Sequence, residues 1–278
     1  MASRSARSSA RAWRVKLGRK VDLDAVAADS TEGAPGGGDK ATTIKETGVL
    51  TERIGELQHR LWAEGTRSLL VVLQAMDAAG KDGTVKHVFR GVNPMGVRGV
   101  AFEAPSKTEL AHDFLWRIHR ELPERGDIGI FNRSHYEDVL IVRVNRLVPE
   151  SVWRPRYEAI RRFEEHLVAE GTTIVKLYLH ISKEEQAARF RARLEDPTKN
   201  WKFAAGDLDV RERWDDYRSA YVEAIRRTAT ADAPWYVIPA DRKWYRNWVV
   251  STILVETLER MDPQYPPPAE GLGDIAFT

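Results

Sequence analysis

The chain contains no cysteine, which excludes disulfide bonds, thiolate metal sites and a cysteine nucleophile. It has no apolar run near the roughly 20 residues that a helix needs to cross a bilayer. The first residues are rich in Arg and Ser but lack the apolar segment of a secretory signal. We therefore expect a cytoplasmic protein without a membrane partner. Its 278 residues, 42% hydrophobic and 30% charged, suit a soluble α/β protein of one large domain or two small ones.

The chain also lacks a large net charge, which is only +2 at pH 7. Residues 1–20, however, carry seven basic side chains and no acidic one. The remainder is therefore net negative, so a polyanion would have to bind in a local groove. The basic arm could contact nucleic acid or another polyanion, but such arms are more often solvated tails, and we expect no nucleic-acid partner. We expect residues 1–40, which include a Gly-rich stretch, to be mostly unstructured.

Residues 69–83, LLVVLQAMDAAGKDG, are the stretch around which the chain is organised. The apolar run at 69–73 predicts a buried strand. A short Ala/Gly turn follows, then Gly80 and Lys81, then a helical pattern of apolar residues. A strand, a glycine turn and a lysine at a helix start form a phosphate cradle, because free backbone N–H groups and the positive end of the helix face one anion.

This stretch departs from the P-loop pattern G-x-x-x-x-G-K-[ST] at two positions. Ala75 replaces the first glycine, and Asp82 replaces the Ser or Thr that binds magnesium. An ordinary strand–turn–helix junction with an incidental lysine is the alternative interpretation. If the site uses Mg²⁺, another oxygen must bind the ion, and Asp77 in the same loop is the nearest candidate.

The rest of the sequence predicts strands that alternate with helices. Expected strands lie at residues 69–73, 97–104, 127–131, 172–181 and 235–238. Expected helices lie at 43–64, 105–122, 134–145, 150–170, 182–195, 209–228 and 243–261, with capping-box spacing at Ser106/Glu109 and Ser134/Glu137. This alternation predicts an α/β fold, in which a parallel sheet is covered on both faces and binds ligands beyond the carboxyl ends of its strands. We expect one domain over residues 41–278.

Polar residues elsewhere could join the phosphate loop. Asn132 and Arg133 follow the third strand and would lie at the same edge of the sheet. Residues 183–212 predict a mobile lid that excludes water from a phosphate site, so that transfer competes with hydrolysis. A solvated, charged helix face is the alternative interpretation. The basic residues of this region are Arg189, Arg193, Lys199 and Lys202.

Several separate segments strongly resemble the polyphosphate kinase 2 family of polyphosphate:nucleotide phosphotransferases. They are AMDAAGKDGTVKHVFRGVNP, HDFLWRIH, LPERGDIGIFNRSHYEDVL, DPTKNWKF, RWDDY and ADRKWYRNW, and they span about residues 13–265. The resemblance implies a P-loop kinase fold, a three-layer α/β/α sandwich related to thymidylate kinase. It also implies direct transfer of a terminal phosphate between inorganic polyphosphate and a nucleotide, with Mg²⁺ and without a phosphohistidine, in a homodimer or homotetramer.

The resemblance extends to the site residues. The family's Walker A form, G-x-D-x-A-G-K-x-G, matches residues 75–83 apart from Ala75. Its Walker B segment, often D-R-S-W-Y-N-R, corresponds to residues 132–138, so Asn132 replaces an aspartate thought to bind Mg²⁺. The F-N-R-S-x-Y-E form resembles the subgroup that accepts AMP as well as ADP, in which the residue matching Glu137 is thought to favour AMP. Glu137 could instead be only the capping partner of Ser134, and both roles could hold.

These features give the expected function, an Mg²⁺-dependent enzyme that reversibly moves the terminal phosphate of polyphosphate to AMP, ADP or both. Lys81 would neutralise the phosphate, and Asp77 would organise the metal with Asn132 as a weak ligand. Arg133, Arg189 and Arg193 would stabilise charge in the transition state. Adenine nucleotides are expected, with guanine nucleotides left open. The expected nucleotide- and phosphate-binding residues are Ala78, Ala79, Gly80, Lys81, Asp82, Gly83, Asn132, Glu137, Lys199 and Lys202.

Two other functions stay open on the sequence. An ATP-dependent nucleoside monophosphate kinase would differ in whether its groove accepts a long polyanion. A catalytically silent protein that binds polyphosphate or nucleic acid is compatible with Ala75 and Asn132. Replacing Lys81 with Ala should abolish turnover in either enzyme, whereas binding indifferent to Lys81 would support the silent protein.

Overall fold

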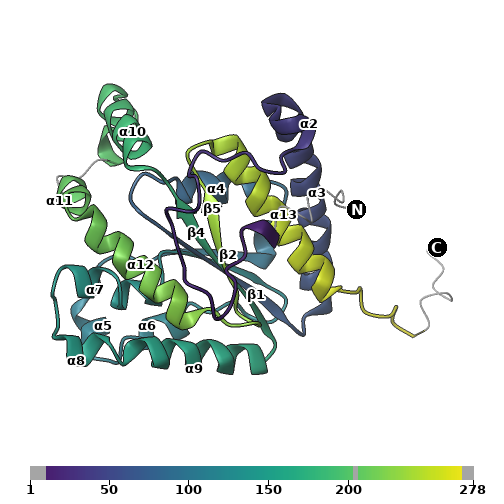
Figure 1. Cartoon of the computed structure of the whole chain (residues 1–278). Coiled ribbons are helices and arrows are strands. Elements are labelled where there is room, and N and C mark those ends of the chain that lie inside the picture. The colour runs from purple at the N-terminus through teal and green to yellow at the C-terminus, as the bar shows by residue number, and fades with distance from the viewer. Residues whose placement is uncertain (1–10, 203–205, 271–278) are drawn as a thin grey trace.

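Five parallel strands form a single sheet in the order β2-β3-β1-β4-β5 (Figure 1). The computed structural model describes residues 11–202 and 206–270, apart from the side chains of Lys202 and Asp207. Its strands are β1 (Ser68–Ala75), β2 (Val97–Ala101), β3 (Ile128–Asn132), β4 (Thr172–His180) and β5 (Trp235–Pro239). The prediction of a parallel α/β sheet is confirmed.

Helices cover both faces of this sheet. All eight residues of β1 are buried, as expected for an apolar central strand with helices on each side. Helices α3 (Lys40–Glu64), α4 (Lys81–Val88) and α13 (Lys243–Met261) pack together on one face (Figure 1). Helices α9 (Arg156–Ala169) and α12 (Trp214–Thr228) pack together on the other. The molecule is therefore a three-layer α/β/α sandwich with apolar core on both sides of the sheet.

The carboxyl ends of the strands meet along one edge of the sheet. Leu73 of β1 pairs with Asn132 of β3, and Ala75 pairs with Leu179 of β4. The backbone N–H of Arg133 donates to the carbonyl of Leu73 at 3.1 Å. The phosphate loop and the Asn132–Arg133 pair therefore lie next to each other, as the sequence predicted.

Shorter elements complete the fold. None of the described helices is both long enough and apolar enough to cross a membrane. The elements are α2 (Pro35–Gly38), η1 (Pro94–Gly96), α5 (Lys107–Leu110), α6 (Trp116–His119), η2 (His135–Asp138), α7 (Ile141–Val144), α8 (Glu150–Trp153), α10 (Lys183–Glu195), η3 (Asn200–Lys202) and α11 (Gly206–Glu212).

Three expected helices are each broken in two. Residues 105–122 form α5 and α6, although the predicted capping box of Ser106 and Glu109 does form at the start of α5. Residues 134–145 form η2 and α7, and the break falls at Val139 and Leu140, whose backbone angles are not helical. Residues 150–170 form α8 and α9, and the break falls at Pro155, which has no N–H to continue the helix.

The prediction that residues 1–40 are mostly unstructured needs correction over residues 11–40. Trp13 is only 7% exposed, and its indole N–H donates to Tyr245 Oη at 3.0 Å. Its carbonyl accepts from the N–H of Val237, and the N–H of Val15 donates to the carbonyl of Trp235, both at 2.9 Å. This segment therefore lies beside β5, the last strand in the sheet order. Sequence-based prediction missed these contacts because the few apolar residues of the segment stand among charged residues and glycines.

Candidate active site

A cavity of about 720 Å³ opens at the carboxyl edge of the sheet. Its walls come from the loop after β1, the ends of β2 and β3, and helices α10 and α13. Seven of its lining side chains are Lys or Arg, against three that are Asp or Glu. The cavity is therefore suited to an anion. Its cationic lining residues are Lys81, Arg133, Arg189, Arg193, Lys199, Lys243 and Arg246.

The phosphate loop turns into α4 at Gly80. This residue has φ +100° and precedes Lys81, the first residue of the helix. A Cβ atom on Gly80 would lie 2.1 Å from Nη1 of Arg246, so only glycine fits there. Ala78 also has a positive φ, of +62°. The loop thus presents the start of α4 to the cavity, where backbone N–H groups and the helix dipole attract an anion.

Lys81 lies within this loop, where its Nζ donates to the carbonyl of Ala75 at 3.1 Å. Burial lowers the pKa of its ammonium group, and the nearby carboxylate of Asp77 opposes that effect only partly. An ammonium that is poorly solvated and incompletely neutralised gains most from a bound anion. Lys81 therefore presents an incompletely neutralised ammonium group at the cavity.

Two arginines, Arg189 of α10 and Arg246 of α13, hold the outside of the loop, and we call them the arginine clamp. Arg189 donates to the carbonyls of Ala78 and Ala79 at 3.0 and 2.9 Å. Arg246 donates to the carbonyl of Ala79 at 3.0 Å. Burial and the charge of Arg189 lower the pKa of Arg246 to about 9. The clamp fixes the loop and adds positive charge that an anion in the cavity would stabilise.

The third-strand residues contact the phosphate loop directly. Arg133 has φ +62°, and its Nη2 lies 3.3 Å from Oδ1 of Asp77. Asn132 Nδ2 donates to Oδ1 of Asp82 at 2.8 Å. The sequence placed all four residues in one site, and the structure brings them together. Asp77, Asp82, Asn132 and Arg133 all line the cavity.

Glu137 does not line the cavity but lies close behind it. Burial raises the pKa of its carboxyl group, while the charges of Arg133 and Lys81 act in the opposite direction. The side chain of Gln74 also acts to lower this pKa. Since Ser134 binds the N–H of Tyr136, the capping-box role considered for Glu137 is not observed.

The lid residues fall into two groups. Arg193 and Lys199 line the cavity, as does Trp201, which is 77% exposed. Arg189 also lines the cavity, but its guanidinium donates to four backbone carbonyls and to Glu185, and these contacts are those of a residue that positions the loop. The side chain of Lys202 lies outside the described residues.

Sequence reasoning missed three lining residues of α13, namely Lys243, Arg246 and Asn247. They follow β5 at the same edge of the sheet as the phosphate loop. The segment ADRKWYRNW, which carries part of the family resemblance, contains all three and was the available signal. The carbonyl of Ala79 that Arg246 contacts lies 167 residues away along the chain, so spacing alone did not reveal this role.

The strand order and the lysine-bearing loop after the central strand place this chain among the P-loop phosphotransferases. Comparison with known proteins identifies the family. The family model described as Polyphosphate kinase 2 (PPK2) matches residues 38–266. The chain belongs to this family.

Individual relatives cover nearly the whole chain. A protein of Meiothermus ruber named AMP/ADP-polyphosphate phosphotransferase is 54% identical over 256 residues, which are 92% of this chain and 95% of the relative. An ADP-polyphosphate phosphotransferase of Rhodopseudomonas palustris is 50% identical over 77% of this chain and 78% of its own length. The crystal structure of Polyphosphate Kinase 2 from Arthrobacter aurescens TC1 has 43% identity and a TM-score of 0.91, covering 96% of this chain and 94% of that one.

Proposed function

We propose that this enzyme moves the terminal phosphate of inorganic polyphosphate to AMP and to ADP, in a reversible reaction that yields ADP and ATP. The observation that carries the proposal is the cavity, which places seven cationic side chains around one phosphate loop. So many cations suit a donor with a charge on every phosphate unit. The Meiothermus relative, whose name includes both acceptors, supports this choice of substrates.

The proposed reaction is a single displacement at phosphorus. A terminal phosphate oxygen of the nucleotide forms a bond to the end phosphorus of polyphosphate, and the bond from that phosphorus to the next bridging oxygen breaks. The shortened chain leaves with the electron pair as an anion. Lys81, Arg133 and Arg193 would neutralise charge on the transferred group, and the arginine clamp would keep the loop amides in place.

Enzymes of this kind generally need a divalent metal, and we propose Mg²⁺. Mg²⁺ prefers oxygen ligands and is usually bound by one or two carboxylates together with substrate phosphates and water. Asp77 and Asp82 both line the cavity beside the loop and fit that requirement, and Asn132 lies next to Asp82. The ion would neutralise phosphate oxygens when bound. Asp77 would then be the principal protein ligand.

Other features of the assignment follow the family resemblance. We propose that Glu137 favours AMP as acceptor and that adenine is the preferred base, with guanine accepted less well. We also propose a homodimer or homotetramer that works in the cytoplasm, where its nucleotide substrates are found.

The role of Lys81 provides the direct test. Lys81→Ala should lower kcat with polyphosphate and ADP at least about 100-fold, since it removes the charge nearest the phosphate loop. Lys86→Ala is the matched control, because Lys86 is exposed on the same helix and does not line the cavity. Equal activity of both variants, at unchanged thermal stability, would contradict the proposed site.

A further inference from the structure

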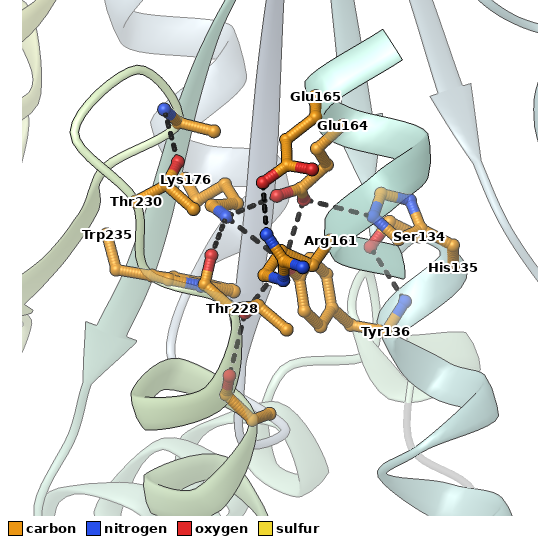
Figure 2. A network of polar contacts seen from close by, with 12 residues as sticks. Ser134, His135, Tyr136, Arg161, Glu164, Glu165, Lys176, Thr228, Thr230 and Trp235 are labelled. Carbon is orange, nitrogen blue, oxygen red and sulfur yellow. Dashed lines mark hydrogen bonds and ion pairs between the residues drawn. The ribbon is translucent and has the colours of Figure 1, made fainter. Parts of the chain in front are cut away.

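A group of buried polar residues lies behind the active site, between α9, β4 and η2. Lys176 of β4 and Glu164 of α9 are 0% and 1% exposed, and Nζ lies 2.5 Å from Oε2 (Figure 2). Lys176 also donates to the carbonyl of Thr228 at 2.7 Å. Neither residue lines the cavity. We call Glu164 and Lys176 the buried ion pair.

This pair converges on one short segment. Figure 2 shows Glu164 between Lys176 and the residues that follow β3. The hydroxyl of Tyr136 lies 2.7 Å from Oε1 of Glu164 and accepts from Lys176 Nζ at 3.2 Å. Nε2 of His135 lies 3.3 Å from the same Oε1. Both residues are fully buried and stand between Arg133 and Glu137 in the chain.

The same segment is also held by β1, next to β4 in the sheet. Ser134 Oγ accepts from Gln74 Nε2 at 3.1 Å and from the N–H of Tyr136 at 3.2 Å. The side chain of Gln74 also acts to lower the pKa of the Glu137 carboxyl group. Residues 134–136 are therefore fixed between the central strand and the buried ion pair. Their position sets where Glu137 stands relative to Lys81.

Stability of the fold does not explain why two charges lie here. A buried ion pair loses its hydration, and well-packed apolar residues of similar volume are often as stable or more so. A strand inside the sheet, such as β4, would ordinarily carry an apolar residue where Lys176 stands. The pair does, however, supply directional contacts to Tyr136 and His135 that an apolar pair could not. What the ion pair provides and an apolar pair could not is therefore the position of residues 134–136.

We infer that Glu164 and Lys176 are positioning residues that hold Tyr136, and through it Glu137, in the geometry that selects AMP as acceptor. This inference rests on the proposed function, because it concerns the acceptor of that reaction. It predicts that removing a contact remote from the cavity alters the preference between AMP and ADP.

The test replaces both charges together, as Glu164→Leu with Lys176→Met, because removing one alone would leave the other buried and unpaired. Tyr136→Phe removes only the hydroxyl between them and serves as an independent variant. The matched control is Arg161→Gln with Glu165→Gln, an exposed ion pair on the same helix α9. For each protein, kcat/KM is measured with AMP and with ADP at saturating polyphosphate, together with the Tm.

We expect the ratio of kcat/KM for AMP to that for ADP to change at least about fivefold in both buried variants, which is the effect of about one hydrogen bond. Adding Tyr136→Phe to the double variant should change the ratio less than it does in the parent, because the hydroxyl there has lost its contacts with the buried ion pair and keeps that with Thr228 Oγ1. The exposed control should keep the parent ratio.

The inference is overturned if the parent is active and neither buried variant changes the ratio, even when kcat or Tm falls, because that pattern belongs to a merely structural role. If the double variant does not fold, Tyr136→Phe decides alone. A parent that transfers phosphate to neither nucleotide would overturn the proposed function, and the inference with it.

Discussion

At the scale of single residues, the phosphate loop is shaped by the arginine clamp and by one glycine. Arg189 donates to four backbone carbonyls, two of them in the loop. Arg246 approaches the loop so closely that only the hydrogen of Gly80 leaves room. The loop conformation therefore depends on side chains of α10 and α13, far away in sequence.

This close approach makes Gly80 a sharp target for mutation. Gly80→Ala should lower the free energy of unfolding by about 1–3 kcal/mol for its positive φ alone, with a further loss from the clash with Arg246. Gly99→Ala, in β2, meets nothing within 4 Å and should be neutral or slightly stabilising. Urea unfolding measures both, and equal stabilities of the two variants would refute this account of the loop.

Individual site residues were predictable to different degrees. Lys81, Asp77 and Asp82 belong to one local motif, and Asn132 and Arg133 end a strand, so pattern and topology located them. Arg246 was missed because its role depends on the packing of α13 against α4. The transition-state role expected for Arg189 stays a prediction, and its contacts with four carbonyls and with Glu185 were not foreseen, because spacing carries no information on which acceptors a guanidinium meets.

At the scale of elements, α10 is tied to the phosphate loop from its first turn onward. Gln186 Nε2 donates to the carbonyl of Asp77 at 3.0 Å, one turn before Arg189. The first part of the predicted lid is therefore anchored to the site, whereas Arg193 and Lys199 lie beyond these anchors. Any closing motion would then involve the later residues.

Replacing Arg189 should lower both the stability of the fold and the affinity for polyphosphate. Arg189→Met removes the donor to the carbonyls of Ala78, Ala240 and Asp241 and one of the two donors to that of Ala79, so we expect a loss of at least about 2 kcal/mol in the free energy of unfolding and a higher KM for polyphosphate. Arg191→Met, exposed on the same helix, should stay within about 0.5 kcal/mol of the parent. Urea titration and steady-state kinetics measure these effects, and similar behaviour of the two variants would argue against the anchor.

Glu64 links α3 to the segment after α13, and its ionisation makes the stability of the fold depend on pH. Hydrogen bonds from Arg67 lower the pKa of Glu64 to about 2. Because the folded pKa lies below the unfolded value, the stabilisation is complete above about pH 4.5 and is lost as pH falls toward 2. The difference in unfolding free energy between the parent and Glu64→Gln should therefore shrink over that range.

The exposed Glu52, on the same helix, supplies the control. Glu52→Gln should differ little from the parent at any pH. Chemical unfolding at a series of pH values between about 7 and 3 compares the three proteins. A difference for Glu64→Gln that grows on acidification would show that the carboxylate does not stabilise the fold as described.

At the scale of the whole molecule, the N-terminal segment covers an otherwise open sheet edge. Arg14 forms an antiparallel bridge with Tyr236 of β5, the last strand in the sheet order. Glu32 accepts from the hydroxyl of Tyr245 at 2.6 Å through its carbonyl. A covered edge cannot pair with another chain. Residues 11–34 therefore form part of the folded domain.

Trp13 tests this contribution. Trp13→Ala should lower the free energy of unfolding by about 3–5 kcal/mol, because a buried indole and its bond to Tyr245 are lost. Leu17→Ala is the matched control in the same segment, where the side chain is 53% exposed, and it should cost less than about 0.5 kcal/mol. Thermal and urea unfolding compare them, and a silent Trp13→Ala would show that the segment is dispensable.

The global architecture was more predictable than its details. Apolar runs and alternating elements indicated the parallel sheet, and the long helices expected at 43–64 and 243–261 were both found. The helices at 105–122, 134–145 and 150–170 were predicted as continuous because their apolar spacing runs across Pro155 and other local breaks. The contacts of Trp13 could not be predicted, since they join residues more than 220 positions apart.

The use of polyphosphate as donor separates the proposed function from that of an ATP-dependent nucleoside monophosphate kinase. The most direct measurement incubates the enzyme with AMP or ADP, long-chain polyphosphate and Mg²⁺, and separates the nucleotides by chromatography, with ATP replacing polyphosphate in a parallel reaction with AMP. We predict that AMP is converted to ADP and then to ATP with polyphosphate as the only donor. Absence of product from polyphosphate, together with ADP formation from AMP and ATP, would contradict the account and indicate a nucleoside monophosphate kinase.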